Sequence, residues 1–324
     1  MIEGGEVHLR YGASRDGEGG AAGYAGMVTC GSVWVCPVCS AKIAAERAQE
    51  LTRLITWNAE RGGSVGLLTL TMQHHAGHRL RDLRRGLTKA WRHVTSSRGW
   101  KEAKGHLGMD GYVRAIEATH GANGWHLHIH CLLIFDGPIS TELVDLLAEE
   151  VWARWSVGLG REGFTAVREH AVDVRIGDHA LERLAGYINK LAFEAVGGRW
   201  KKGRAGGRTP FELLADGLAT GLADDLELWL EWEQGSKGMR QLVWSRGLKG
   251  RVGLDERTDE EIAEDTATGS TIAVLPARTW KLVHPFAEDL LTVTETGGPA
   301  AAYAWLDARG LIFEAREDDP PPPD

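Results

Sequence analysis

The chain has 324 residues, 25% of them charged and 43% hydrophobic, so it is long enough for one large domain or two ordinary ones. It shows no signal peptide and no apolar run long enough to cross a bilayer, which argues against secreted and membrane classes and favours the cytoplasm. The net charge of −8 argues at first against a nucleic-acid partner, but the acid is segregated: residues 1–210 carry net +5 and residues 211–324 net −13.

Within the positive part, basic residues gather in two clusters that flank a group of histidines. Basic runs are often only solvated faces, but two such clusters beside a histidine group favour a phosphate-backbone partner. We therefore predict DNA contacts from Arg79, Arg81, Arg84, Arg85, Lys89 and Arg92 in the first cluster and from Lys201, Lys202 and Arg204 in the second.

Residues 1–60 are expected to form an N-terminal segment containing cysteines. Its first 29 residues are Gly-rich and weakly patterned, and a charged helix is predicted from about 41 to 60. Cys30, Cys36 and Cys39 lie between these parts. Closely spaced cysteines indicate metal ligands in a reducing compartment. Either they hold a structural zinc, which needs a fourth ligand such as His8, or they are buried thiols.

Residues 61–208 are expected to form the central domain. Strands are predicted at about 67–72, 111–119, 125–135 and 172–176, and Gly-Ala-Asn-Gly at 121–124 is typical of a hairpin turn. Helices are predicted at about 79–97, 140–156 and 179–195. The order β-α-β-β-α-β indicates an α+β fold, a split β-α-β (ferredoxin- or RRM-like) antiparallel sheet with two helices on one face and the other face open.

The histidine strand is the most informative segment. Side chains alternate along a strand, so His126, His128 and His130 project from one face while the residues between them form an apolar face. Three core histidines would each need a buried partner, whereas imidazole is a common metal ligand. We therefore predict a metal site on the open face of the sheet.

Two further groups complete the predicted site. Glu117 lies on the preceding strand, where a hairpin brings it beside the histidines; the alternative is an ordinary exposed carboxylate. Two imidazoles and one carboxylate leave positions for water and substrate at a divalent cation. Tyr187 flanks the apolar stripe of the helix at 179–195, with Lys190 one turn further on. This arrangement suits a tyrosine that attacks a phosphodiester beside a charge-stabilising ammonium.

Residues 209–316 are expected to form a C-terminal accessory region of mixed structure. It begins with a helical stretch at about 211–233 and contains an acidic segment at 255–265. The Pro-rich end, 317–324, is predicted to be a disordered tail. No phosphate loop of an ATPase is present in the sequence, so unwinding of duplex DNA would need a partner protein.

Four motifs in this order resemble the HUH endonuclease superfamily, and most of all the rolling-circle plasmid replication initiators (Rep) of high-GC Gram-positive plasmids and integrative elements. They are Cys-Gly-Ser-Val-Trp-Val-Cys-Pro-Val-Cys-Ser-Ala-Lys-Ile at 30–43, Leu-Thr-Leu-Thr at 68–71, His-Leu-His-Ile-His at 126–130 and Tyr-Ile-Asn-Lys at 187–190. The motifs span about residues 30–195.

The resemblance implies nicking of one strand at a double-strand origin, with Tyr187 linked to the 5′-phosphate and a 3′-hydroxyl freed as primer. It implies Mg²⁺ or Mn²⁺ on His128 and His130, with His126 as a third ligand or a group behind the ligands. Single-stranded and origin DNA, a host helicase and a polymerase are the implied partners. Related single-tyrosine initiators use a glutamate one turn before the tyrosine in termination, whereas here that position is Arg183.

Other classes of protein fit less of the sequence. A relaxase or single-strand transposase of the same superfamily would differ in the order or number of motifs. A zinc deaminase needs His-x-Glu before Pro-Cys-x-x-Cys, and here the cysteines precede the histidines. A zinc-ribbon DNA-binding regulator would explain the cysteines and the basic clusters but would leave the histidine strand and Tyr187 without a role.

Overall fold

The computed structural model describes residues 5–13, 20–27, 31–177, 207–240, 242–264 and 269–316. The chain divides into two compact units, and the boundaries differ from the predicted ones at residues 60 and 208. Ser32–Asp259 form one unit, whereas the two ends, Met1–Gly31 and Glu260–Asp324, form the other. The predicted cysteine segment is therefore split between the units, and much of the predicted accessory region belongs to the larger one.

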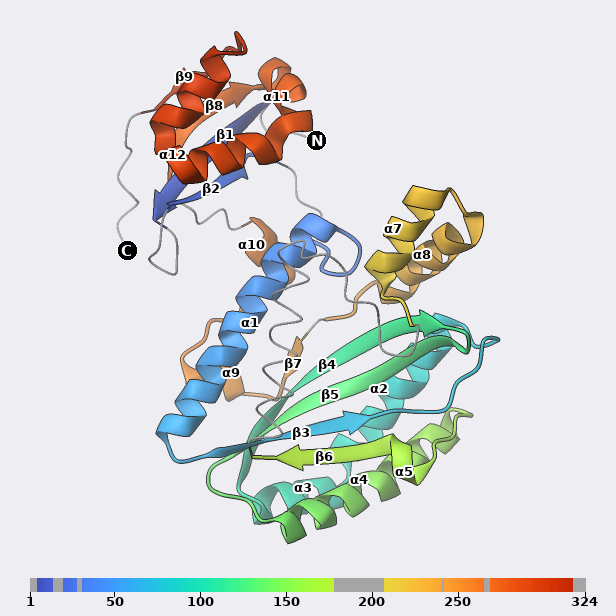
Figure 1. Cartoon of the computed structure of the whole chain (residues 1–324). Helices are drawn as coiled ribbons and strands as arrows, with labels where there is room; N and C mark the ends of the chain where they lie inside the picture. The colour runs from blue at the N-terminus through green and yellow to red at the C-terminus, as the bar shows by residue number, and fades with distance from the viewer. Residues whose placement is uncertain are drawn as a thin grey trace. The chain divides into compact units, whose positions relative to one another are not determined.

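The larger unit is built on a five-stranded antiparallel sheet with the order β6-β3-β5-β4-β7 (Figure 1). Its strands are β3 (Ser64–Leu70), β4 (Met109–Gly121), β5 (Gly124–Phe135), β6 (Val172–Ile176) and the short β7 (Leu242–Trp244). The four predicted strands have the neighbours that a split β-α-β plan requires, so the predicted α+β fold is confirmed. Strand β7, which was not predicted, extends the sheet at the β4 edge.

One face of this sheet is covered by helices α2 (Leu80–Ser96) and α4 (Thr141–Arg161), with α3 (Arg98–His106) beside them (Figure 1). Helix α4 is capped at its N-terminus by Ser140, whose hydroxyl accepts from the Leu143 amide. The predicted apolar face of the histidine strand lies against these helices and is fully buried: Trp125, Leu127, Ile129, Cys131, Leu133 and Phe135. Helix α3 was not predicted as a separate element.

The opposite face of the sheet is open at one end only, so the prediction of a wholly open face is wrong. Leu132 and Ile134 lie on the same face of β5 as the histidines, and both are buried. They pack against Leu51 and Leu54 of α1 (Pro37–Glu60) and Leu248 of α9 (Leu248–Val252). Along β5 this face is therefore imidazole-bearing and partly exposed at the N-terminal end, and apolar and covered at the C-terminal end.

Buried charges hold this cover in place. Lys249 of α9 donates to Glu50 of α1 at 2.8 Å, and Arg47 reaches Glu50 at 2.7 Å and Asp259 at 2.8 Å. Lys249, Glu50 and Arg47 are only 3%, 5% and 7% exposed. Burying charges costs free energy unless they are paired, so the network makes the position of α9 against α1 specific.

The hairpin that joins β4 to β5 has the predicted position. The strands end at Gly121 and begin again at Gly124, and Gly124 has φ +79°. A Cβ on Gly124 would also lie 2.8 Å from the Ala76 backbone, so both geometry and space require glycine here. The tight turn fixes the register that pairs β4 with β5 along their full length.

The helical stretch predicted at 211–233 is two helices, α7 (Pro210–Thr220) and α8 (Ala223–Ser236). They are separated at Gly221, which ends α7 in the left-handed conformation. Thr209 and Glu212 form a capping box at the start of α7. Helix α8 contacts strand β5 through Trp232, which stacks on Trp125. The short α5 (Arg168–Ala171) leads into β6.

The two ends of the chain form a second, four-stranded sheet with the order β2-β1-β8-β9. Its strands are β1 (Glu6–Ala13), β2 (Gly20–Ala25), β8 (Ser270–Pro276) and β9 (Glu314–Ala315). Helices α10 (Asp259–Glu264), α11 (Ala277–Val283), the 3-10 turn η2 (His284–Phe286) and α12 (Ala287–Asp307) complete the C-terminal part. The N-terminal residues taken as weakly patterned therefore form two strands. Among the described residues, no helix has the length and apolar character needed to cross a membrane.

Candidate metal centre and active site

The three histidines of β5 lie on one face and are partly exposed, as predicted. Strand β4 pairs with β5 so that Glu117 stands directly opposite His128, while Ala115 is opposite His130 and Thr119 opposite His126. Because directly opposed side chains share a face of the sheet, Glu117 is on the imidazole face. Glu117 is 21% exposed and contacts the histidines, unlike an ordinary exposed carboxylate, and its role as a metal ligand stays a prediction.

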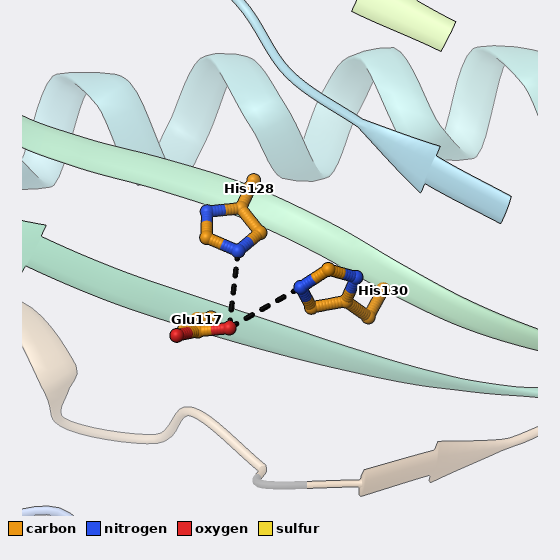
Figure 2. A group of neighbouring side chains, drawn as sticks. All are labelled: Glu117, His128 and His130. Atoms are coloured by element: carbon orange, nitrogen blue, oxygen red, sulfur yellow. Dashed lines mark hydrogen bonds and ion pairs between the residues drawn. The ribbon is translucent and has the colours of Figure 1, made fainter. Parts of the chain in front are cut away.

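Glu117, His128 and His130 converge on one point (Figure 2). The Oε2 atom of Glu117 lies 3.1 Å from Nε2 of His128 and 3.2 Å from Nε2 of His130. The three side chains are 21%, 14% and 20% exposed, so the cluster is shielded but open to solvent on one side. Among the residues that the structure describes, this is the one group of three or more His, Cys, Asp or Glu with metal-binding spacing.

Strand β3 contributes a side chain behind this cluster. Thr69 pairs with His130 in the β3–β5 register, and its Oγ1 lies 3.2 Å from Nδ1 of His130. A hydroxyl that accepts from Nδ1–H leaves the lone pair on Nε2, the nitrogen that faces Glu117. Thr71, the other threonine of the 68–71 motif, donates its hydroxyl to the His170 carbonyl. Nδ1 of His128 is buried without a hydrogen-bond partner among the described residues.

His126 is not a member of the converging group. Its Nδ1 lies 2.8 Å from Nε2 of His74, whose Nδ1 is 3.0 Å from the Asn123 carbonyl oxygen. Burial, helped by the neighbouring His128 and His74, lowers the pKa of His126 to about 4. His74 was missed by sequence analysis. The available signal was its position two residues after the first predicted strand, which pairs with the histidine strand.

The donor set fits a divalent cation. Two imidazole nitrogens and one carboxylate oxygen lie within 4.8 Å of one another, and neutral imidazoles with one carboxylate carry a compensating negative charge. The hydroxyl of Thr69 orients one of the imidazoles, as partners behind metal ligands commonly do. Two strands and a tight hairpin position all three ligands, so the site is preorganised.

Several predicted site residues lie outside the described residues: Tyr187, Lys190, Cys30, Lys201, Lys202 and Arg204. The helix predicted at 179–195 lies there as well. Cys36 caps the N-terminus of α1 through its Sγ, which accepts from the Cys39 amide, and Cys39 is buried. Zinc binding by these cysteines stays a prediction. Cys131 is buried in the core, which raises the pKa of its thiol and keeps it protonated.

The predicted basic cluster at 79–92 lies on α2, and α2 covers the face of the sheet opposite the histidines. The exposed side chains of this cluster are Arg79, Arg81, Arg85, Lys89 and Arg92. Glu162 partly neutralises it, at 3.0 Å from Lys89 and 3.8 Å from Arg85. The cluster that flanks the histidines in sequence thus belongs to a different surface of the unit.

The sequence matches a family model described as a replication protein over residues 25–274. It is similar to Protein rep of Streptomyces lividans, 30% identical over 295 residues that cover 71% of this chain and 65% of that protein. It is also similar to a protein named Neomycin resistance protein of Streptomyces cyanogenus, 33% identical over 143 residues that cover 36% of this chain and 33% of that protein. The chain thus spans about two thirds or less of the length of these relatives. No solved structure shows a significant match. Because the family model covers most of the chain and includes the histidine centre, the chain belongs to the replication protein (Rep) family.

Proposed function

We propose that this chain initiates rolling-circle replication by nicking one DNA strand at a double-strand origin through a 5′-phosphotyrosine link. The observation that carries the proposal is the convergence of Glu117, His128 and His130 on the open end of a split β-α-β sheet. Membership of the Rep family supports DNA phosphodiesters as the substrate class of this centre.

Glu117, His128 and His130 would hold Mg²⁺ or Mn²⁺. A bound divalent cation would supply Lewis acidity at a non-bridging oxygen of the scissile phosphate. The protein's own contribution is placement: the β4–β5 pairing fixes the ligands, and Thr69 fixes the ring of His130. The covered end of the same face, where Leu132 and Ile134 pack, limits the substrate to the histidine end.

Tyr187 is the proposed nucleophile. Its phenolic oxygen attacks phosphorus and loses its proton to solvent, the bond from phosphorus to the 3′-oxygen breaks, and that oxygen takes up a proton to become the free 3′-hydroxyl. The protein then carries the 5′-phosphate on Tyr187. Lys190, one helical turn away in the predicted helix, would stabilise negative charge on the phosphate.

The environments of other tyrosines support this choice. The chain has five tyrosines. Tyr24 and Tyr303 donate their hydroxyls to the carbonyls of Ala287 and Ile272, within the terminal unit. Burial raises the pKa of Tyr112, which packs against the helix-covered face of the sheet and so lies away from the histidines. Tyr24, Tyr112 and Tyr303 therefore have structural roles, which leaves fewer tyrosines as candidates for the nucleophile.

A cleavage assay tests the proposal. The protein is incubated with Mn²⁺ and end-labelled single-stranded origin oligonucleotides, together with Tyr187→Phe and His128→Gln variants. We expect a denaturation-resistant DNA adduct with the parent chain and none with either variant. If the parent chain binds the DNA but forms no adduct, the result would favour a non-catalytic regulator. An adduct retained by Tyr187→Phe would exclude Tyr187 as the nucleophile.

Host proteins complete the proposed cycle. A host helicase would unwind the duplex from the nick, since the sequence has no ATPase phosphate loop, and a host polymerase would extend the 3′-hydroxyl. The adduct assay on purified protein with single-stranded oligonucleotides needs neither partner, so it isolates the nicking step from the rest of replication.

A further inference from the structure

Three arginines surround a hollow on the side of the sheet away from the histidines. The hollow has a volume of about 180 Å³ and is lined by Arg84, Arg114 and Arg240, with Thr88, Met239 and Val243 among the other residues. A water molecule takes up about 30 Å³ of liquid, and a tetrahedral oxyanion of five heavy atoms needs only a few times that volume. The space is therefore sufficient for one phosphate group.

Arg114 is the unusual member. It lies on β4 between Tyr112 and Ile116, two residues that pack into the helix-covered core, so its side chain leaves the sheet on that side. Its Nε atom is fully enclosed and has no hydrogen-bond partner, and no carboxylate of the described residues pairs with the guanidinium. Burial lowers the pKa of Arg114, which reflects the cost of keeping this charge out of water.

Structural arginines in the same unit look different. Arg47, which is 7% exposed, is paired with Glu50 and Asp259. Arg208 makes a two-pronged contact with Asp225 at 2.6 and 2.8 Å. In both cases carboxylates compensate the charge, for the buried Arg47 and for Arg208, which is 36% exposed. Arg114 has none among the described residues, and the other charged groups lining its hollow are also cations.

The wall of the hollow is fixed in advance. Nη1 of Arg84 donates to the carbonyls of Gly235 and Lys237 at 2.6 and 2.8 Å, and Trp34 donates to the Met239 carbonyl at 2.8 Å. These bonds hold the segment that carries Arg240. Because Nη1 makes both of the Arg84 bonds, the remaining N–H groups of this guanidinium are available to a ligand.

A second hollow lies next to the first. It has a volume of about 270 Å³, shares Arg84 and Thr88 and is lined further by Arg81, Arg85 and Lys89 on α2. Arg85 and Lys89 are partly neutralised by Asp82 and Glu162, so Arg81 and Arg84 contribute most of the uncompensated positive charge there. Guanidinium groups match the oxygen geometry of phosphate and are weakly hydrated, so they suit such a site.

We propose that Arg84, Arg114 and Arg240 form a phosphate-binding site separate from the histidine centre. The ligand is a phosphate group, supplied either by the backbone of bound DNA or by a free phosphate-bearing molecule such as a nucleotide. The site shares no residue with Glu117, His128 or His130 and does not depend on the nicking chemistry. Failure of the adduct assay would not contradict the phosphate-binding site. Failure of the phosphate-binding experiments would not contradict the proposed nicking activity.

Two measurements on the full chain separate the sources. In the first, the melting temperature is followed during titration with inorganic phosphate or tripolyphosphate, against sodium chloride at equal ionic strength. In the second, the affinity for single-stranded DNA is measured at several salt concentrations. The variants are Arg114→Met, Arg240→Ala and, as control, Arg98→Met, whose side chain on α3 is 90% exposed.

If a free ligand is the source, phosphate raises the melting temperature of the parent chain saturably. The phosphate concentration at half-saturation is then roughly tenfold or more higher for Arg114→Met and for Arg240→Ala. If DNA is the source, either variant lowers the salt slope by about 0.7, the value for one single-strand phosphate. Arg98→Met should behave like the parent chain in both. The proposal is overturned if neither measurement distinguishes the hollow variants from Arg98→Met.

Stability in chloride buffer distinguishes a binding role from a structural one. Removing a buried charge that has no partner should leave the melting temperature of Arg114→Met unchanged or higher. A marked fall would mean that Arg114 serves the fold. In that case the phosphate and DNA measurements on Arg240→Ala test the proposal, because Arg240 is exposed and its replacement does not disturb the core.

Discussion

Glu117 and His128 face each other across the β4–β5 ladder, and one oxygen of Glu117 lies 3.1 Å from His128 and 3.2 Å from His130. One carboxylate oxygen thus links both imidazoles through the nitrogens that would bind a cation. Both imidazole nitrogens lie within 3.2 Å of this oxygen, so the three atoms are already gathered as a ligand set for a cation. Glu117 is therefore the residue on which the character of the centre depends most.

Replacing Glu117 with glutamine should weaken binding of Mn²⁺ by at least tenfold. The amide keeps the size of the side chain but removes the charge that attracts the cation. Titration calorimetry with Mn²⁺ at pH 7.5 measures the effect. Glu102→Gln, an exposed position on α3, is the matched control and should bind like the parent chain. Equal affinities for both variants would contradict the assignment of Glu117 as a ligand.

Replacing Thr69 with valine should lower the Mn²⁺ affinity by roughly 10- to 100-fold, the usual range for losing a partner behind a metal ligand. Valine has nearly the same shape but cannot accept from Nδ1 of His130, which then loses its fixed tautomer and orientation. Thr69→Ser keeps the hydroxyl and should retain most of the affinity. If serine and valine were equally weak binders, the hydroxyl would not be the cause.

The central sheet was predictable because its signals are local. Alternation along 125–135 separates an apolar face from an imidazole face, and both are found as expected. The turn at 121–124 fixes the register, and register places Glu117 opposite His128. The site residues on these two strands therefore follow from spacing alone.

Other features depend on contacts between distant residues. Strand β1 pairs with β8, which places Leu9 beside Ala273, and no local pattern announces a partner so far along the chain. The cover over Leu132 by α1 and α9 depends in the same way on packing between remote segments. The bond between His74 and His126 follows from the path of a loop. Periodicity in the sequence predicts which face of a strand or helix is apolar. It does not predict contacts between remote segments, which are seen only in the folded structure.

Replacing Lys249 with methionine should lower the free energy of unfolding by about 3 kcal/mol. The change leaves Glu50 buried with one partner fewer, and removing one side of a buried ion pair costs more than the pair itself contributes. Urea denaturation followed by tryptophan fluorescence measures the loss. Lys237→Met, at an exposed position, should change stability by less than about 0.5 kcal/mol. Similar values for both variants would mean that the network contributes little.

His120 should make the fold sensitive to mild acid. Burial, with help from Arg208, lowers its pKa below the ordinary 6.5, so the folded chain prefers the neutral ring. Below about pH 6.5 the unfolded chain takes up a proton that the folded chain does not, and stability therefore falls as the pH drops.

Replacing His120 with phenylalanine keeps the edge contact with Trp125 but removes this titration. In EDTA, the fall in melting temperature between pH 7.5 and pH 5.0 should be smaller in the variant, by roughly 1–2 °C for a partly exposed group. Thermal denaturation by circular dichroism checks it. An identical fall in both proteins would show that His120 does not contribute.

Attack on DNA by Tyr187 is tested most directly by identifying the amino acid that carries the nucleotide after reaction with Mn²⁺ and origin oligonucleotide. Trypsin cuts after Arg183 and Lys190, so Tyr187 lies in the short peptide Leu-Ala-Gly-Tyr-Ile-Asn-Lys at 184–190. After nuclease trimming, mass spectrometry should find this peptide shifted by a 5′-phosphonucleotide on the tyrosine. A nucleotide on any other peptide, or an unmodified 184–190 peptide in a sample that has cleaved its DNA, would contradict Tyr187 as the nucleophile.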